Sequence, residues 1–196
     1  MSTDVLRLAE EQDAPAIAEI YAPSVTASVT SFELVAPGPD EMAMRIAKVL
    51  THAPWLVLSR DHEVVGYAYA SRHRDPAAYL WSVNTSVYVR ADQKRTGAGR
   101  TLYRTLLSLL RIQGFYTAHA GIALPNDASV RLHEAMGFQP IGVYRSVGFK
   151  AGGWRDVGWW QLALRPRVGV PEPPLSLQEA KARADWSAAL SNVLEP

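Results

Sequence analysis

The region from residue 82 to residue 113 constrains the fold most strongly, because it predicts a strand, a glycine loop and a helix in direct succession. Side chains alternate in polarity at 82–89, as in a strand, and one face carries Ser82, Asn84, Ser86 and Tyr88. After residue 101 leucines recur at helical spacing, with polar side chains opposite them and Gly114 placed to end the helix. The glycine loop therefore lies between a strand and a helix N-terminus.

This loop, "KRTGAGR" at 94–100, has the chemistry of an anion site. Backbone N–H groups point outward at a helix start, the helix dipole adds positive potential, and glycines let an oxyanion approach closely. Leu102 stands where a dinucleotide fingerprint has its third glycine, and the Gly-Lys-Ser/Thr of a Walker loop is absent. The expected ligand is the phosphate or pyrophosphate of another kind of compound.

Strand and helix patterns alternate along most of the remaining chain. Asp13 before Pro15, Asp40 before 41–50, and Asn126 are the expected helix starts. Strands at the start, middle and end of the chain, with helices between, predict an α/β (α+β) protein with a mixed central sheet flanked by helices. We expect strands at 5–9, on both sides of a turn at 60–63, and at 79–90, 115–124, 140–149 and 154–164, and helices at 14–21, 41–50 and 128–136.

The C-terminal end differs in composition from the rest. Residues 165–174, "RPRVGVPEPP", are typical of a linker, and 176–193 could form a helix with Leu177, Ala184 and Trp186 available for packing. We therefore expect one domain at 1–165, followed at 166–196 by a Pro-rich linker and a helical tail. The tail is either loosely held or docked on the body or on a partner subunit.

Composition excludes several classes of protein. The chain of 196 residues has no cysteine, which excludes a disulfide framework and a cysteine nucleophile, and its His and acidic residues show no ligand spacing, so we expect no metal. A net charge of +1 gives no field for nucleic acid or acidic membranes. The N-terminus is too polar for a signal peptide, and no apolar run reaches membrane-spanning length. We expect a cytoplasmic enzyme or binding domain without nucleic-acid or membrane partners.

Several segments resemble, in order and spacing, consecutive blocks of the phosphinothricin and methionine-sulfoximine N-acetyltransferases, a branch of the GNAT superfamily. These segments are "PWLVLSRDHEVVGYAYA", "AYLWSVNTSVYV", "IALPNDASVRLHEAMGF" and "SVGFKAGGWRDVGWWQL", and the glycine loop resembles the superfamily's acetyl-coenzyme A loop. The likeness covers about residues 3–165. It implies the GNAT fold, with a splayed sheet, and transfer of acetyl from acetyl-coenzyme A (acetyl-CoA) to the amine of a small amino-acid-like acceptor.

The resemblance also implies which residues hold acetyl-CoA. Loop amides would cradle the pyrophosphate, strand backbone would pair with the pantetheine arm, and two residues of the next helix would face the arm. Lys94 replaces the Gln or Arg usual in the family, so a cation remains. The implied coenzyme residues are Val87, Tyr88, Val89, Lys94, Arg95, Thr96, Gly97, Ala98, Gly99, Arg100, Thr101, Asn126 and Ser129.

The implied chemistry needs a base for the amine and an acid for the departing thiolate. His133 matches the place of the family's proton donor, and imidazole suits such work because it titrates near neutrality. The branch's usual base is a Glu at the position of Asn84, but an amide cannot accept a proton. We expect Asn84 to orient water or substrate, with His119 or Glu33 as a replacement base.

The acceptor side departs from the branch as well. Pro76 stands where the branch has an Arg that helps to hold an anionic substrate, while Arg72 and Arg74 lie nearby. His62 and His73 lie in turn-like sequence and are interpreted as solvated. The expected substrate-binding residues are Phe32, Glu33, Arg74, Tyr79, Tyr88 and Gly121.

Two alternatives remain open at this stage. The acceptor could be another amine, such as another amino acid, a polyamine or a protein N-terminus. The chain could also be a CoA-binding sensor or structural subunit that has lost catalysis, which Asn84 favours. Trp154, Trp159 and Trp160 cluster near the last strand, where relatives form dimers, so a homodimer is expected.

Overall fold

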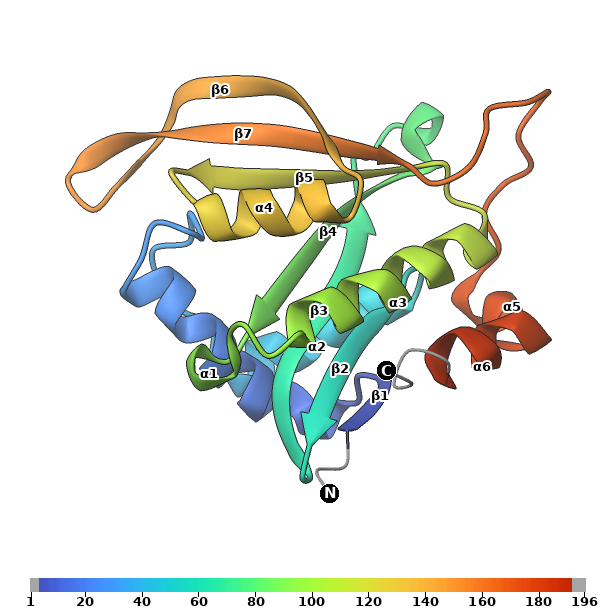
Figure 1. Ribbon diagram of the computed structural model, residues 1–196, viewed down its shortest axis with the longest axis horizontal. Helices are drawn as coiled ribbons and strands as arrows, with labels where there is room; N and C mark the ends of the chain where they lie inside the picture. The colour runs from blue at the N-terminus through green and yellow to red at the C-terminus, as the bar shows by residue number, and fades with distance from the viewer. Residues whose placement is uncertain (1–3, 192–196) are drawn as a thin grey trace.

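The computed structural model describes residues 4–191, and within them seven strands form one mixed sheet in the order β1-β2-β3-β4-β5-β7-β6 (Figure 1). Neighbouring strands are antiparallel except β4 and β5, which are parallel. This arrangement confirms the mixed α/β fold expected from the sequence. The strands are β1 (Asp4–Leu8), β2 (Trp55–Arg60), β3 (Glu63–Arg72), β4 (Ser82–Val89), β5 (Thr117–Leu124), β6 (Gln139–Lys150) and β7 (Gly153–Ala163).

The sheet is splayed between β4 and β5. Their pairing covers only 82–84 against 117–119, and it ends at the pair Asn84 and His119. Beyond that pair β4 stays bonded to β3 as far as Val89, and β5 stays bonded to β7 as far as Leu124. The two strands therefore diverge toward their C-terminal ends. We call the Asn84–His119 pair the vertex of the splay.

Helices cover both faces of the sheet (Figure 1). Tyr21 of α1 packs edge-on against Tyr88 with ring centroids 5.0 Å apart, whereas Tyr103 of α3 is hydrogen-bonded to Thr85. Because residues 85 and 88 of one strand point to opposite faces, α1 and α3 lie on opposite sides. The helices are α1 (Ala14–Thr26), α2 (Pro39–Leu50), α3 (Ala98–Gln113), α4 (Asp127–Ala135), α5 (Leu177–Lys181) and α6 (Ala184–Ser191).

The helix α3 confirms the expected amphipathic pattern. Leu102, Leu106, Leu109 and Leu110 are fully buried against the sheet, and Gly114 ends the helix in the left-handed conformation with φ of 100°. Each buried leucine contributes about 2 kcal/mol relative to an exposed one. This packing fixes the N-terminus of α3 beside the C-terminal end of β4, where the glycine loop lies.

Two expected helix limits are wrong, and one expected side-chain cap does not form. The helix α1 runs to Thr26 and not to Tyr21, because its buried residues Tyr21 and Val25 keep it against the core despite Pro23. Asp13 stands at the N-cap of α1, but its carboxylate binds Arg7 and the N–H of Glu10 instead of capping the helix. Proline is favoured at a first helical position, so α2 begins at Pro39, and Asp40 lies inside its first turn.

The tail docks on the body, and it forms two short helices where one was expected over 176–193. Trp186 is buried, α5 and α6 contact α3, and α6 also contacts β1. Gln113 at the end of α3 donates to the carbonyls of His52 (2.6 Å) and Leu175 (3.0 Å), which anchors the linker. Residues 192–193 lie outside the described residues, and the division at residue 165 stays a prediction. Among residues 4–191 no helix combines the length and apolarity that crossing a membrane requires.

Candidate active site

The glycine loop leaves the first turn of α3 uncapped. The 3-10 turn η3 (Ala91–Gln93) follows β4, and Gly97 occupies the N-cap with φ of 91°, a conformation that favours glycine. No side chain caps the helix, and its first backbone bond joins the N–H of Thr101 to the carbonyl of Gly97. The N–H groups of 98–100 therefore have no intrahelical acceptor, which makes this end of α3 an anion site.

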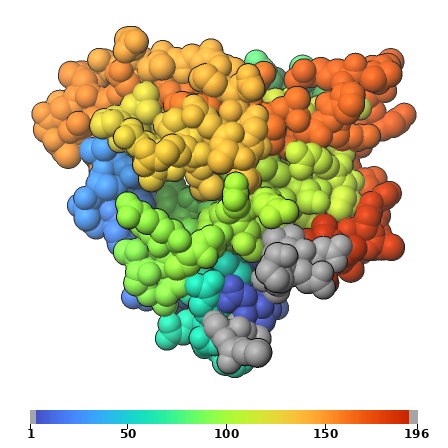
Figure 2. All heavy atoms as spheres, viewed as in Figure 1, coloured from blue at the N-terminus to red at the C-terminus, as the bar shows by residue number. Residues whose placement is uncertain are grey.

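Cations surround these N–H groups. Lys94, Arg95 and Arg100 are exposed, and none of them forms an ion pair within residues 4–191. The base of the loop is fixed, because Arg60 bonds to Gln93 Oε1 (2.9 Å) and to Asp4. Figure 2 shows the surface hollowed between this green region and the yellow atoms of α4. The hollow leads from the anion site toward the splay.

The edge of β4 that faces the splay is open. Val87, Tyr88 and Val89 pair with β3 on one side, and the ladder between β4 and β5 has already ended at residue 84. Backbone groups on that edge are thus available to an extended ligand, in the manner of an added strand. From Val89 back to the vertex the strand rises about 16 Å, which gives the length of the open edge.

The first helix on the far side of the splay, α4, carries His133 in a closed network. Asn126 caps α4, because its side-chain Oδ1 accepts a hydrogen bond from the backbone N–H of Ser129. His133 is 4% exposed, its Nδ1 bonds to the carbonyl of Ser129 (2.7 Å), and its Nε2 bonds to the Tyr103 hydroxyl (2.8 Å). Burial lowers the pKa of His133, and Nδ1 is the donor to the Ser129 carbonyl because a carbonyl oxygen only accepts. Both ring nitrogens are used by the protein.

This network continues to the vertex. The Tyr103 hydroxyl is 2.9 Å from Thr85 Oγ1, and Thr85 donates to the carbonyl of His119 at 3.2 Å. A row of buried polar groups therefore joins α4, α3, β4 and β5 on one face of the sheet. It bridges the two diverging strands one residue beyond their last pair.

The other face of the vertex carries a second group of imidazoles. His73, directly after β3, has Nδ1 at 2.8 Å from Asn84 Oδ1. Its ring stacks on His119 with centroids 4.2 Å apart and an interplanar angle of 22°. The interpretation of His73 as a solvated turn residue is thus wrong, because the end of β3 brings it against β4 and β5.

Aromatic residues complete this vertex cluster, which we define as His73, Asn84, His119, Tyr79 and Trp159. Gly121 lies beside it. Tyr79 and Trp159 lie 5.6 and 6.3 Å from the His73 ring. Gly121 faces the Trp159 ring, which would lie 3.3 Å from an added Cβ. Burial, followed by the nearby His73 and Arg167, lowers the pKa of His119 to about 4. His119 is therefore uncharged near neutral pH.

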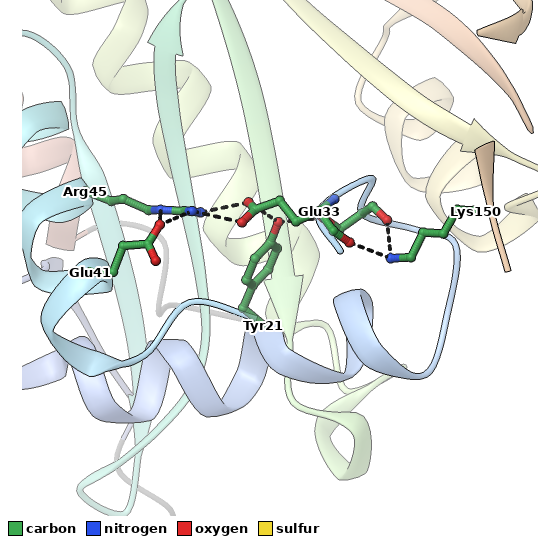
Figure 3. Close-up of polar contacts among 6 residues, drawn as sticks. Tyr21, Glu33, Glu41, Arg45 and Lys150 are labelled. Carbon is green, nitrogen blue, oxygen red and sulfur yellow. Dashed lines mark hydrogen bonds and ion pairs between the residues drawn. The ribbon is translucent and has the colours of Figure 1, made fainter. Parts of the chain in front are cut away.

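Glu33 lies in a network of hydrogen bonds with Tyr21, Arg45 and Lys150 (Figure 3). Arg45 donates two hydrogen bonds to its carboxylate (2.7 and 2.8 Å), and Tyr21 donates a third (2.8 Å). The Arg45 guanidinium holds the pKa of Glu33 below its usual value, which makes it a poor base. The buried Lys150 donates to the carbonyls of Ser31 and Glu33, so this loop is pinned to β6.

A cavity of about 500 Å³ lies between α2 and strands β2 and β3, on the face of the vertex cluster. Its wall includes the stacked rings of Trp55, Tyr67 and Tyr69. It also includes the carboxylate of Asp75 and the cations Lys48 and Arg72, and neither cation forms an ion pair within the described residues. The cavity can accept a small anionic molecule with an apolar part.

Comparison with known proteins assigns this architecture to a family. The profile of the Acetyltransferase (GNAT) domain matches residues 6–159, which is most of the chain. The protein belongs to the GNAT acetyltransferases. The match spans β1 to β7 and includes the splay, the glycine loop and the vertex cluster.

Curated and solved GNAT relatives match along nearly their whole length. The chain is 43% identical to the phosphinothricin N-acetyltransferase of Alcaligenes faecalis over 81% of this chain and 82% of the relative. It is 38% identical to that of Streptomyces viridochromogenes, over 86% and 90%. A phosphinothricin acetyltransferase from Sinorhizobium meliloti, solved in complex with acetyl-CoA, has a TM-score of 0.80 at 34% identity and covers 86% and 95%. The chain is thus an acetyl-CoA-dependent N-acetyltransferase.

The GNAT fold brings the predicted site residues into three groups. The coenzyme residues of 87–101 line the open edge and the anion site, with Asn126 and Ser129 across the splay on α4. Asn84, His119, Gly121 and Tyr79 meet at the vertex. Phe32, Glu33 and Tyr88 are linked through Tyr21 and β6, and Arg74 is exposed beside a second cavity. Sequence reasoning missed His73 as a site residue, because its contact with Asn84 depends on the register between β3 and β4.

Proposed function

We propose that this GNAT enzyme acetylates the amine of a small amino acid of the phosphinothricin or methionine-sulfoximine type. The observation that supports this acceptor is the cavity beside the vertex. Arg72 in its wall has no acidic partner among residues 4–191, so a carboxylate ligand would pair with it. Arg72 would take the part of the family's missing Arg at Pro76.

The coenzyme would be bound from the anion site to the vertex. Pyrophosphate oxygens would accept hydrogen bonds from the free N–H groups at the start of α3, with Lys94, Arg95 and Arg100 around them. The pantetheine arm would lie along the open edge at Val87–Val89. An arm that follows this edge for about 16 Å ends at the vertex, so the thioester would lie near Asn84 and Gly121.

The chemistry then requires three events at the vertex. A neutral amine attacks the thioester carbon, the carbonyl oxygen becomes an oxyanion that accepts hydrogen bonds from backbone N–H, and sulfur leaves as a thiolate that takes a proton. Backbone groups of the open β4 edge are the available donors. The role of His133 as proton donor stays a prediction; its two internal hydrogen bonds favour a structural role instead.

The proposal includes a homodimer in the cytoplasm, without nucleic-acid or membrane partners. The net charge of +1 supports the lack of polyanionic partners. Apolar side chains on β6 and β7 support self-association, because a monomer rarely exposes so many together. They are Ile141, Val143, Tyr144, Val147, Phe149 and Trp154, the last 65% exposed. Light scattering on the purified protein measures the assembly.

Steady-state release of CoA thiol with a panel of amines tests the acceptor. Each amino acid should be paired with its decarboxylated amine. Arg72→Gln should raise KM for the amino acid about tenfold and leave the paired amine unchanged, because only the amino acid has a carboxylate to bind. Arg74→Gln tests the expected substrate-binding residue two positions on, and a rise in KM for the amino acid in that variant alone would contradict the role of Arg72. Thiol release that is absent with every amine would instead support a CoA-binding sensor.

The coenzyme site has its own test. Gly97→Ala adds a Cβ at φ of 91°, whereas Gly169→Ala makes the same change at φ of 67° in the linker, and neither added Cβ would meet a heavy atom within 4 Å. Acetyl-CoA should raise the Tm of wild type and of Gly169→Ala, because it binds only the folded state. The rise should be much smaller for Gly97→Ala. Equal rises in both variants would contradict the anion site.

A further inference from the structure

We propose that His73 is the general base of this enzyme and that Asn84 positions it, in place of the carboxylate that the branch carries at position 84. The inference rests on the proposed acetyl transfer at the vertex. His73 lies after β3, yet its imidazole is bonded to Asn84 at the last pair of the splay. The base is thus supplied from the neighbouring strand.

The amide of Asn84 fixes which nitrogen of His73 carries the proton. Asn84 Nδ2 is directed at the carbonyl of Arg72 at 3.5 Å, so Oδ1 is the atom that faces His73. An amide oxygen only accepts, and therefore His73 Nδ1 is the donor. This assignment leaves the lone pair on Nε2, which has no hydrogen-bond partner among residues 4–191. An Asn behind a His holds the tautomer in the same way in Cys-His-Asn proteases.

Residues from three elements pack against His73. From β5 it meets His119, which stays neutral near pH 7, and from η2 (Ala77–Tyr79) it meets Tyr79. From β7 it meets the uncharged Trp159, and the charged groups on its own segment are Arg72, Arg74 and Asp75. His73 is half-buried, so its ring stays accessible to water.

The cavity proposed for the acceptor is lined by the two residues that precede His73. Ser71 and Arg72 line the cavity, Ser71 is the β-sheet partner of Asn84, and the carbonyl of Arg72 accepts from Asn84. A carboxylate on Arg72 would thus leave the α-amine of the same molecule near the vertex. One short segment, 71–73, would contribute to both the acceptor cavity and the base.

In the proposed step Nε2 of His73 takes a proton from the ammonium form of the acceptor, directly or through one water. The neutral nitrogen then forms a bond to the thioester carbon, and the C–S bond breaks as the carbonyl re-forms. The attacking nitrogen loses one further proton and the thiolate takes up one through water, while the proton on His73 passes to water, so one proton is released overall. The products are the N-acetylated amine and CoA thiol, and no oxidant or metal is required.

The decisive experiment is the pH dependence of kcat/KM for thiol release in His73→Gln. The variant should lose about 10²-fold at pH 7, the usual scale of general-base assistance, and the loss should shrink as the pH rises and more amine is neutral. Acetyl-CoA should still raise its Tm. His62→Gln, in the exposed turn between β2 and β3, is the control and should match wild type.

A second substitution separates a base from a merely structural residue. Asn84→Glu in the His73→Gln background places a carboxylate at the vertex and should recover at least tenfold of the lost kcat/KM at pH 7. Imidazole in the buffer should also partly restore a His73→Gly variant. Neither recovery is expected if the loss came from altered packing.

The tautomer can be read in the wild type without any variant. The chain has five histidines, so the ring nitrogens of His73 can be assigned by long-range ¹H–¹⁵N NMR. A proton on Nδ1 and a lone pair on Nε2 are expected above neutral pH. The opposite tautomer, or an active wild type whose pH profile is unchanged in His73→Gln, would overturn the role of His73 and leave the acetyl transfer standing. A wild type that binds acetyl-CoA but acetylates no amine would overturn both.

Discussion

The two faces of the sheet at the splay carry the same type of side chain in opposite situations. On the α4 face His133 is buried, and the protein occupies both of its nitrogens. On the other face His73 is half-buried, with one nitrogen held by Asn84 and the other without a protein partner. A histidine whose hydrogen bonds are all internal holds elements together, whereas one with a free lone pair can exchange protons with a substrate. The two histidines differ in how many of their ring nitrogens are hydrogen-bonded within the protein, and not in residue type.

The largest expected effect is a difference in stability between variants of the two histidines. His133→Leu would leave the Tyr103 hydroxyl and the Ser129 carbonyl without partners in the core, at a cost of about 3 kcal/mol in the free energy of unfolding. His73→Leu should cost less than about 1 kcal/mol. Urea denaturation of both variants measures the contrast. A His133→Leu protein of wild-type stability with a large loss of kcat would break the comparison and restore His133 as the acid.

A smaller effect is expected on activity when two neighbouring residues of β4, one on each face of the sheet, are compared. Asn84→Leu removes the acceptor behind His73 and should lower kcat/KM about tenfold, with the loss greatest on the acidic side of the profile. Thr85→Val, on the opposite face, should reduce stability and leave the shape of the pH profile unchanged. Profiles that change in the same way for both variants would show that the faces are not independent.

The smallest effect concerns His119 and pH. Its pKa is lowered to about 4 in the folded protein from an ordinary value of 6.5, so the unfolded chain binds more protons between these values. Stability should therefore fall as the pH drops from 6.5 toward 4, and His119→Gln should show a weaker fall. Thermal unfolding across this range measures the difference. An identical pH dependence in both proteins would contradict the burial of the imidazole.

Much of the fold follows from local pattern. The β2–β3 turn, β4, the glycine loop and α3 were all predicted within a few residues, because alternation, helical spacing and glycine act over short distances. The C-terminal end of α1 was not, since core burial of Val25 outweighed the helix-breaking tendency of Pro23, and neither was the start of α2 at Pro39. The docking of Trp186 depends on α3 and β1, which lie far away in the chain.

The candidate site divides in the same way. The predicted coenzyme residues of 87–101 lie close together in the sequence, so a linear motif can predict them, and their role stays a prediction. The vertex cluster is assembled by strand register, and nothing in the segment around His73 indicates that it meets Asn84. Glu33 was identified as a pocket residue, but its ion pair with Arg45 crosses between a loop and a helix. Such pairings are set by tertiary packing and have no local signature.

The strand order also determines when each strand can join the sheet during synthesis. The last strand of the sheet to be made, β7, lies between β5 and β6, so β6 has no place in the sheet until the ribosome has added β7. The glycine loop, β4 and α3 are complete well before then. At roughly 5–20 residues per second the interval lasts on the order of a few seconds. During it, the nascent chain already has its anion site but lacks the wall that carries Trp159, so we expect chaperone contacts to concentrate on the apolar strand β6.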